Sequence, residues 1–380
     1  MKYAYQKNNR YFAQTANDVR DIVEQELIEL EAKDTSLASS GVYFNATQDV
    51  LYTINYNSHL CNRIIAPLLT FDCHSDRYLY KTALKIEWDD FINEKQTFAV
   101  YASVSNSAIK HSKYAALKLK DAIADYFREK KGVRPSVDTI DPDLWINLHI
   151  RNNKATISID TSGGSLHRRG YRKRSVSAPM IETLAAAIIR LSGWDGVTPL
   201  YDPFCGSGTL LFEACLYASN TPPAFLRQKF GFEMLPDFDK NIWIDVKNNS
   251  KQKMKKLSPG LISGSDISEE AVKIAMENRD MIDDSKSIHI KQKDVFQIGD
   301  LNNTFIICNP PYGLRLKKGQ DLSHFYKRLG DFLKQKCTGS TAVIYFGERK
   351  YIKNIGLKPA WKKPLANGGL DGRLVKYELY

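Results

Sequence analysis

The sequence predicts an α/β protein in two parts, an α+β front half followed by a doubly wound domain with a parallel sheet. The front half, up to about residue 164, shows short strands and helices and no glycine-rich ligand-binding loop. After a polar, basic junction at 165–180, strands alternate with helices, which is typical of a parallel sheet covered on both faces. The first strand of this second part runs directly into a glycine turn and a helix, over 199–219.

The front half begins with a short extended piece and a helix that ends near Ala32, because apolar residues recur there at helical spacing. The run "GVYFNA" at 41–46 predicts a strand, and the apolar pattern of 49–65 predicts a helix. The remaining elements are a strand at 97–104, a long helix at 111–132 that stops at Gly132, and strands at 144–150 and 155–160. These elements make one or two small α+β units, which we do not expect to be catalytic.

The second part opens with a helix at 181–194. The strand, glycine turn and helix of 199–219 come next, and a strand followed by a helix that Ser268 caps occupies 260–280. The later elements are strands at 288–296, 304–312 and 341–347, with a helix at 322–336 before the last of them. This order predicts a doubly wound sheet with ligands at its carboxyl edge.

The composition favours a globular protein with an anionic partner. The 380 residues are 43% hydrophobic and carry a formal net charge of +11, with Lys/Arg runs at 129–134, 167–174, 251–256 and 315–319. Such a charge suits nucleic-acid phosphates. No apolar run approaches eighteen residues and no secretory signal is visible, so we expect a cytoplasmic protein without a membrane partner. The six cysteines form no Cys-x-x-Cys pair, which predicts reduced, mostly buried thiols and no metal site.

The glycine turn "DPFCGSGT" at 202–209 is the first candidate binding element. Gly206 and Gly208 permit a sharp turn that leaves the N–H groups of a helix amino terminus facing a ligand. A phosphate-binding P-loop would need a lysine here, and a dinucleotide fold would need a third glycine with an acid about twenty residues later. The turn has neither feature.

Three carboxylates follow successive predicted strands: Asp202, Asp266 and Asp294. No phosphate-binding lysine or arginine lies among them. This set suits a cofactor that has an amino group, a ribose and an adenine but no phosphate. S-adenosylmethionine has these groups.

The turn "NPPY" ends the strand at 304–312. Pro310 and Pro311 cannot continue the ladder, so the Asn309 side-chain carbonyl, the prolyl carbonyls and the Tyr312 ring collect at the strand end. Such a cluster accepts hydrogen bonds from an amine and stacks on a planar ring. An ordinary proline-rich exit turn is the alternative, and the acceptor amine is left open among N6-adenine, N4-cytosine, N2-guanine and glutamine.

The motifs "DPFCGSGT", "SDIS", "KD" and "NPPYG", in this order, resemble those of Rossmann-like class I methyltransferases that modify exocyclic amines. The resemblance implies that Asp202 and the glycine turn hold the methionine end of S-adenosylmethionine and that Asp266 binds the ribose hydroxyls. It also implies that Ile267 packs on the adenine ring and that Asp294 accepts a hydrogen bond from the adenine amine. S-adenosylhomocysteine would be the product. The implied cofactor-binding residues are Thr183, Asp202, Pro203, Phe204, Cys205, Gly206, Gly208, Thr209, Asp266, Ile267, Asp294 and Val295. The implied catalytic residues are Asn309, Pro310, Pro311 and Tyr312.

Further segments resemble the bacterial THUMP-containing family of 23S rRNA guanine-N2 methyltransferases: "SKYAALKLKDAIADYF" (112–127), "RPSVD" (134–138), "ISIDTSGGSLHRRGYR" (157–172) and "APMIETLAAA" (178–187). The resemblance implies a ferredoxin-like unit at 1–60, an RNA-binding THUMP domain at 61–164, a basic linker at 165–180 and a methyltransferase domain at 181–380. Some members carry a second methyltransferase domain, and we expect a single one in these 380 residues.

The junction supplies the expected RNA-binding residues, Arg168, Arg169, Arg172, Lys173 and Arg174. This cluster could contact the RNA backbone or dock the two domains together, and the sequence favours neither role over the other. For Arg169 and Tyr171, a buried structural role is a further alternative. Ribosomal RNA is the expected partner. Two other functions stay open, an N6-adenine methyltransferase acting on RNA or DNA, and a non-catalytic RNA-binding or ribosome-assembly protein.

Overall fold

The structure, a computed structural model, describes residues 3–176, 179–282, 287–311 and 321–380, and it divides into two compact units. Unit 1 comprises the chain through Leu166 together with Arg227–Asn249, and unit 2 comprises His167–Leu226 and Ser250–Tyr380. The segment Arg227–Asn249 lies within the range 181–380 that the sequence assigns to the methyltransferase domain, yet it packs with unit 1. Phe232 stacks on Tyr52 of unit 1 with ring centroids 4.4 Å apart, which shows how aromatic burial holds this segment.

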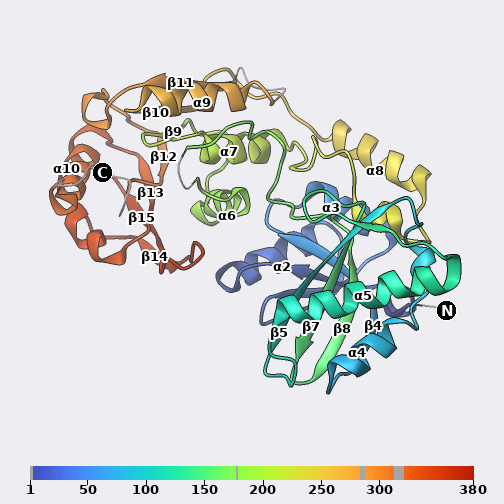
Figure 1. Ribbon diagram of the computed structural model, residues 1–380. Helices are drawn as coiled ribbons and strands as arrows, with labels where there is room; N and C mark the ends of the chain where they lie inside the picture. The colour runs from blue at the N-terminus through green and yellow to red at the C-terminus, as the bar shows by residue number, and fades with distance from the viewer. Residues whose placement is uncertain (1–2, 177–178, 283–286, 312–320) are drawn as a thin grey trace. The chain divides into compact units, whose positions relative to one another are not determined.

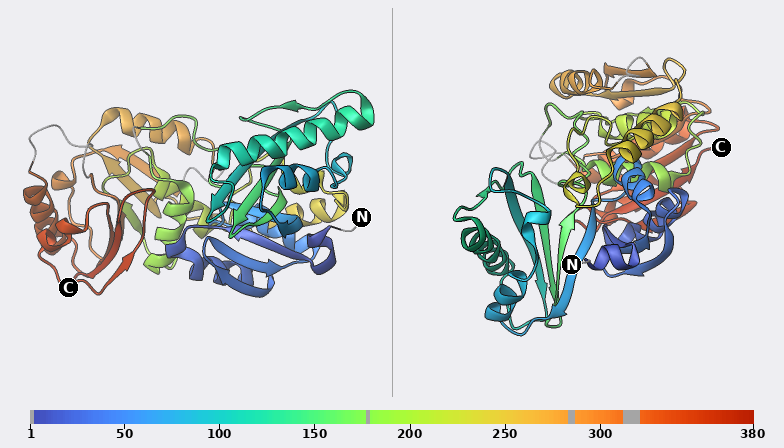
Figure 2. Two further views of the ribbon diagram at one scale, coloured as in Figure 1. Left: turned by 60° about the horizontal axis from the view of Figure 1, so that its bottom comes forward. Right: turned by 90° about the vertical axis from the view of Figure 1, so that its right-hand side faces the viewer.

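Unit 1 is built on one eight-stranded sheet of order β2-β3-β1-β4-β8-β7-β5-β6. Its strands are β1 Arg10–Gln14, β2 Lys33–Ala38, β3 Gly41–Asn45, β4 Arg63–Asp72, β5 Thr97–Ser105, β6 Ser136–Val137, β7 Leu144–Arg151 and β8 Lys154–Asp160. Its helices are α1 Ala4–Asn8, α2 Arg20–Glu29, α3 Gln48–Asn57, α4 Asp76–Ala83 and α5 Ser112–Lys131, and α8 Lys240–Gln252 begins in it. The α5 helix lies across one face of the β5 and β7 strands (Figures 1 and 2).

The helix expected over 49–65 is wrong in its second half. The α3 helix ends at Asn57, and β4 starts at Arg63 and runs through the middle of the sheet. The sequence did not predict this strand because it contains Pro67, and proline is unusual in a central strand. The ladder between β4 and β8 shifts register between Pro67 and Leu69, and this irregularity accommodates the missing N–H. The strand β2 and the helix α4 were also not predicted from the sequence. The end of α5 at Gly132, which has φ of 74°, was predicted.

Unit 2 holds a seven-stranded sheet of order β11-β10-β9-β12-β13-β15-β14, in which β15 runs antiparallel to β13 and β14. Its strands are β9 Leu200–Asp202, β10 Ile262–Asp266, β11 Ile288–Gln292, β12 Phe305–Cys308, β13 Thr341–Phe346, β14 Trp361–Pro364 and β15 Arg373–Glu378. Its helices are α6 Glu182–Ser192, α7 Thr209–Ser219, α9 Glu269–Arg279 and α10 Leu322–Lys336. The expected doubly wound sheet is confirmed. Ser268 caps α9, because its side chain accepts from the Ala271 N–H at 3.2 Å.

The strand order creates the place for a ligand. From β9 the chain moves outward to β10 and β11, and it then returns to the other side of β9 to form β12 (Figure 1). Ligands of such sheets bind at this reversal, outside the carboxyl ends of the strands. Asp202 ends β9 and Asn309 follows β12, so the topology brings two residues more than a hundred positions apart to one edge.

Candidate active site

The glycine turn connects β9 to α7 and forms one wall of a pocket. Gly206 has φ of +54° and Gly208 has φ of +88°, a region that side chains other than glycine rarely adopt. A Cβ at Gly206 would enter open space, whereas one at Gly208 would fall 2.3 Å from the Phe212 ring. The first glycine therefore leaves room beside the turn, and the second permits close packing of α7.

Asp202 lies at the floor of this pocket and is 1% exposed. Burial, together with the nearby Asp266, raises the pKa of its carboxyl to about 8, although the hydrogen bond from the Phe204 N–H at 2.9 Å acts to lower it. A buried acid of this kind is stabilised in its ionised form when a cation binds beside it. The site therefore suits an ammonium group.

Asp266 braces the turn from the next strand. Its carboxylate accepts from the Gly206 N–H and from the Ser268 N–H, each at 2.9 Å. Ile267, next to it, is 68% exposed. Asp294 accepts from the Phe296 N–H at 3.0 Å and so caps a short 3-10 helix, while Val295 is buried beneath it.

The structure brings together only part of the expected cofactor-binding set. The described residues that line the pocket are Val176, Pro179, Met180, Asp202, Phe204, Cys205, Gly206, Ser207, Thr209, Leu210 and Asn309. Asp266, Ile267, Asp294 and Val295 follow β10 and β11 along the same edge, and Pro203 and Gly208 belong to the turn itself. Thr183 sits on α6 with 8% exposure and is not among the lining residues.

Asn309, which precedes the two prolines, also lines the pocket. The Asn309 Oδ1 atom is buried and has no hydrogen-bond partner among the described residues. Buried carbonyl oxygens are rarely left unpaired, and an orphan in a native structure indicates an unseen partner or a functional strain. Pro310 is buried, and the Pro311 carbonyl accepts from the Tyr326 hydroxyl at 3.4 Å. Tyr312, the fourth residue of the predicted catalytic turn, lies outside the described residues.

Two of the five basic residues of the junction cluster, Arg169 and Arg172, pair with buried carboxylates inside unit 2. Arg169 is 2% exposed and pairs with the buried Glu213 of α7 at 3.3 Å, and the Tyr171 hydroxyl donates to Glu213 at 2.9 Å. Burial raises the pKa of Glu213, and Arg169 opposes this rise. A guanidinium in this position cannot reach a phosphate, so Arg169 is one of the buried structural residues that the sequence offered as the alternative.

Arg172 is tied to the pocket wall. Its Nη2 donates to the Met180 carbonyl at 2.8 Å and to the Thr209 hydroxyl at 3.0 Å, and its Nε pairs with Glu182 at 3.1 Å. Arg172 thus connects the junction to the start of α7 and to a lining residue. Arg168, Lys173 and Arg174 are exposed, and Arg174 pairs with Glu277 at 3.3 Å.

Several contributing residues were not found from the sequence. Asn278 of α9 accepts from the N–H groups of Lys173 and Arg174 and donates to the Ser207 carbonyl, so it clamps the junction onto the glycine turn. Nothing in its sequence context signals this role. Glu213 did carry a signal, because a lone carboxylate within the apolar run "TLLFEACL" has to find a buried partner.

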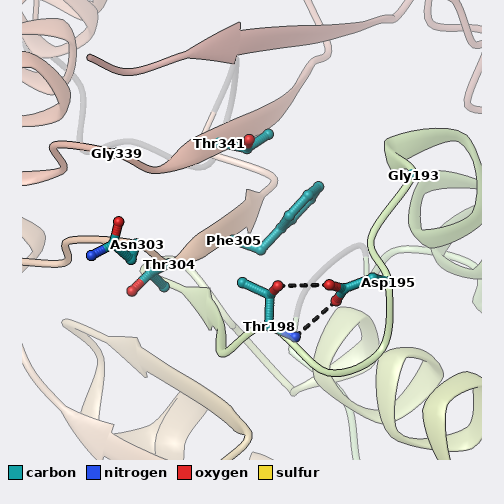
Figure 3. A pocket seen from close by; sticks show the side chains of 8 residues that line it. All are labelled: Gly193, Asp195, Thr198, Asn303, Thr304, Phe305, Gly339 and Thr341. Carbon is teal, nitrogen blue, oxygen red and sulfur yellow. Dashed lines mark hydrogen bonds between the residues drawn. The ribbon is translucent and has the colours of Figure 1, made fainter.

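A second pocket, of about 400 Å³, opens at the opposite edge of the sheet, near the first residues of β12 and β13. Figure 3 shows Asp195 turned back onto its own loop, where it accepts from the Thr198 N–H at 2.8 Å and from the Thr198 hydroxyl at 2.7 Å. Although burial acts in the other direction, these bonds lower the pKa of Asp195. The carboxylate is a loop cap at the amino edge, away from the reversal point.

The donor set of the first pocket fits S-adenosylmethionine. The buried Asp202 and Gly206 both line it, and no lysine or arginine is among the described lining residues, so the pocket favours an ammonium over a phosphate. All six cysteines are buried and free. Among the described residues, no cluster of histidine, cysteine and acidic side chains is arranged to hold a metal. Within the same ranges, no helix is long and apolar enough to span a bilayer.

Comparison with protein families assigns all three regions. Residues 169–376 match the family described as "RMKL-like, methyltransferase domain", residues 74–160 match the THUMP domain, and residues 10–65 match the RlmL ferredoxin-like domain. The chain is 38% identical over 97% of its length to the "Putative RNA methyltransferase slr0064" of Synechocystis sp., and covers 97% of that protein. It is 33% identical to the ribosomal RNA large subunit methyltransferase K/L of Photobacterium profundum, again over 97% of its length, but spans only 53% of that relative.

Solved structures agree with this assignment. The crystal structure of SMU.472, a methyltransferase candidate in complex with S-adenosylhomocysteine, superposes with a TM-score of 0.85 at 26% identity and covers 100% of this chain and 99% of its own. A structure from Listeria monocytogenes, described as a predicted N6-adenine-specific DNA methylase, has a TM-score of 0.84 at 25% identity, over 98% of this chain and 96% of that one. The cofactor is S-adenosylmethionine, and the chain belongs to the RMKL-like methyltransferase family, with a THUMP domain and an RlmL ferredoxin-like domain before the catalytic fold.

Proposed function

We propose that this protein transfers a methyl group from S-adenosylmethionine to the exocyclic N2 amine of a guanine in 23S rRNA, with the base extruded into the Asn309–Tyr312 turn. The observation that carries the proposal is the buried, unpaired Asn309 Oδ1 at the sheet edge that also holds Asp202. An amine that donates to this oxygen would satisfy it. The target would then lie beside the cofactor pocket.

The residues act by position and by their dipoles. When bound, the cofactor supplies an electrophilic methyl group on a sulfonium. Asn309 Oδ1 and the Pro310 carbonyl accept hydrogen bonds from the target amine, which localises its lone pair and fixes its direction. Tyr312 stacks on the extruded base and so offsets the loss of stacking in the RNA. Asp202 would hold the cofactor ammonium. Methylation would leave the target nitrogen with a surplus proton and a low pKa, so the proton would pass to solvent water and the scheme requires no strong general base.

The remaining cofactor residues keep the roles that the family resemblance implies. Asp266 and Ile267 receive the ribose and adenine, and Asp294 and Val295 receive the adenine amine and edge. Thr183, on α6, is a further cofactor candidate. For RNA, the exposed Arg168, Lys173 and Arg174 stay as proposed contacts, whereas Arg169 and Arg172 are engaged inside unit 2.

The choice of RNA rests on the relatives and on the domain composition. Both curated relatives are named as RNA-modifying enzymes, and a THUMP domain precedes the catalytic fold. Because the chain spans about half the length of the K/L relative, the guanine target is a proposal for this domain. An N6-adenine target is the second candidate, since a structural neighbour at 25% identity is titled an adenine-specific DNA methylase.

The test is methylation of ribosomal RNA from a strain that lacks the gene, with labelled S-adenosylmethionine and digestion to nucleosides. We expect label in N2-methylguanosine, and its loss in Asn309→Ala. Asn248→Ala, on the exposed side of α8, is the matched control and keeps full activity. Label in N6-methyladenosine would keep the mechanism and replace the substrate. No label on RNA, DNA or protein would favour a non-catalytic binding protein.

A further inference from the structure

A cationic pocket lies beside β15 and the outermost strand β14 of the unit 2 sheet, where the 3-10 helix η7 (Arg349–Ile355) also contributes lining residues. Its volume is about 510 Å³, within the range of small-ligand sites. The residues that line it are Arg349, Lys350, Ile352, Lys353, Leu357, Pro359, Lys362, Pro364 and Arg373. Cations make up more than half of this set, and the remaining members are all apolar.

The positive charge of the pocket is only partly neutralised. Asp371 is shared by Arg349, at 3.7 Å, and by Arg373, and Glu348 pairs with Lys350 at 2.6 Å. Lys353 and Lys362 are exposed and have no ion-pair partner within the continuously described stretch 321–380. The pocket therefore combines two ammonium groups that have no ion-pair partner in this stretch with apolar lining from Ile352, Leu357 and the prolines. A nucleotide has the complementary parts, an anionic phosphate and a flat base.

The pocket opens at the same sheet edge as the candidate active site. The η7 helix follows the carboxyl end of β13, and Arg373 pairs with Phe346, the last residue of that strand. The neighbouring β12 is parallel to β13, with Cys308 opposite Ile344, and Asn309 follows directly. The pocket and Asn309 therefore lie along one edge of the same sheet.

Stacked aromatic rings connect the pocket to the catalytic turn. Tyr351, in the helix that forms the pocket wall, stacks on Tyr326 of α10 with ring centroids 5.1 Å apart and planes 13° apart. The Tyr326 hydroxyl donates to the Pro311 carbonyl at 3.4 Å. Tyr326 and Tyr351 are buried in one core cluster, so close packing connects the pocket wall to the residue that contacts the Pro311 carbonyl.

We propose that this pocket binds a nucleotide of the RNA substrate that flanks the methylated base, with its phosphate on Lys353 and Lys362 and its base against Ile352 and Leu357. The proposal rests on the proposed function, because it takes RNA as the substrate. It adds a contact surface in the catalytic unit, separate from the junction cluster. The pocket would bind the RNA strand beside the target, while the Asn309 turn accepts the target itself.

The test compares two charge-matched double variants of the full chain. Lys353→Gln/Lys362→Gln removes the two free cations of the pocket, and Lys358→Gln/Lys363→Gln removes two exposed cations next to them that do not line it. The probe is a fluorescein-labelled single-stranded RNA of 23S sequence, titrated by anisotropy at several salt concentrations. Binding of S-adenosylhomocysteine, measured by calorimetry, reports that each variant is folded.

We expect the pocket variant to lose about tenfold in RNA affinity and the slope of log affinity against log salt to become shallower by roughly 0.7, since both lysines contact the same phosphate and each phosphate contact to a single strand contributes about 0.7. The neighbouring variant should keep the wild-type slope, and both should bind S-adenosylhomocysteine normally. Equal losses in the two variants would overturn the pocket and leave the RNA function standing. A wild-type protein that binds S-adenosylhomocysteine but no RNA would overturn the proposed function and the pocket with it.

Discussion

Cofactor binding should release a proton from Asp202, and this is the prediction that the structure defines most sharply. The carboxyl is buried at the pocket floor with a pKa raised to about 8, chiefly by burial. In the cofactor-free protein at pH 7, the group is therefore mostly protonated. An ammonium bound beside it favours the ionised form, so binding has to expel the proton.

The size of the effect follows from the pKa. With a value near 8, about 0.9 of the carboxyl is protonated at pH 7, and about 0.9 proton is released when the ionised form is bound. The ionised fraction rises nearly tenfold from pH 6 to pH 7, so the affinity for S-adenosylhomocysteine should rise roughly tenfold, or about 1.4 kcal/mol. An aspartate with an ordinary pKa near 3.9 would give no change in this window.

The assay is titration calorimetry of S-adenosylhomocysteine at pH 6 and pH 7, in phosphate and in imidazole buffer. The difference in heat between buffers gives the number of protons released. Asp202→Asn keeps the shape of the side chain without the titration, and it should bind weakly with no buffer dependence. Equal affinity at both pH values, with no buffer dependence in the wild type, would refute the reasoning, since Asp202 would then be ionised before the cofactor arrives.

Four further results are expected. Asn309→Ala should lower the methylation rate by about a hundredfold or more and leave S-adenosylhomocysteine affinity unchanged, because only an oriented acceptor is removed; weakened cofactor binding would contradict this role. The raised pKa of Asp202 in the folded protein means that this residue destabilises the fold increasingly as pH rises towards 8, by roughly 1.4 kcal/mol per pH unit. Asp202→Asn should therefore raise the melting temperature of the cofactor-free protein more at pH 8 than at pH 5. Arg169→Met should destabilise the fold by about 3–5 kcal/mol in urea unfolding, because Glu213 is left as an unpaired buried acid, and Arg169→Met/Glu213→Leu should recover much of the loss. Arg172→Lys should weaken S-adenosylhomocysteine binding while RNA affinity stays at the wild-type level; the reverse pattern would restore Arg172 as an RNA contact.

The catalytic half was predicted well because its signals are local. Glycine at a turn with positive φ, acids directly after apolar runs and prolines that end a strand each constrain the chain within a few residues. Strand, turn and helix over 199–219 and the Ser268 cap were confirmed for this reason. The strand β4 was missed because its central Pro67 is accommodated by a register shift that depends on β8, far away in the sequence.

The sequence by itself determined the order of elements, the acids at the strand ends, the amide-proline turn and the class of cofactor they suit. Only the tertiary structure decided which of the junction cations pair with buried carboxylates. Arg169 and Arg172 are indistinguishable from Arg168 and Arg174 in the run "RRGYRKR", but burial against Glu213 and Glu182 occupies the first two. The tertiary structure also gathered the cationic pocket from η7, β14 and β15. The role of a charged side chain depends on its ion-pair partner, and long-range packing rather than the neighbouring sequence determines which partner it has.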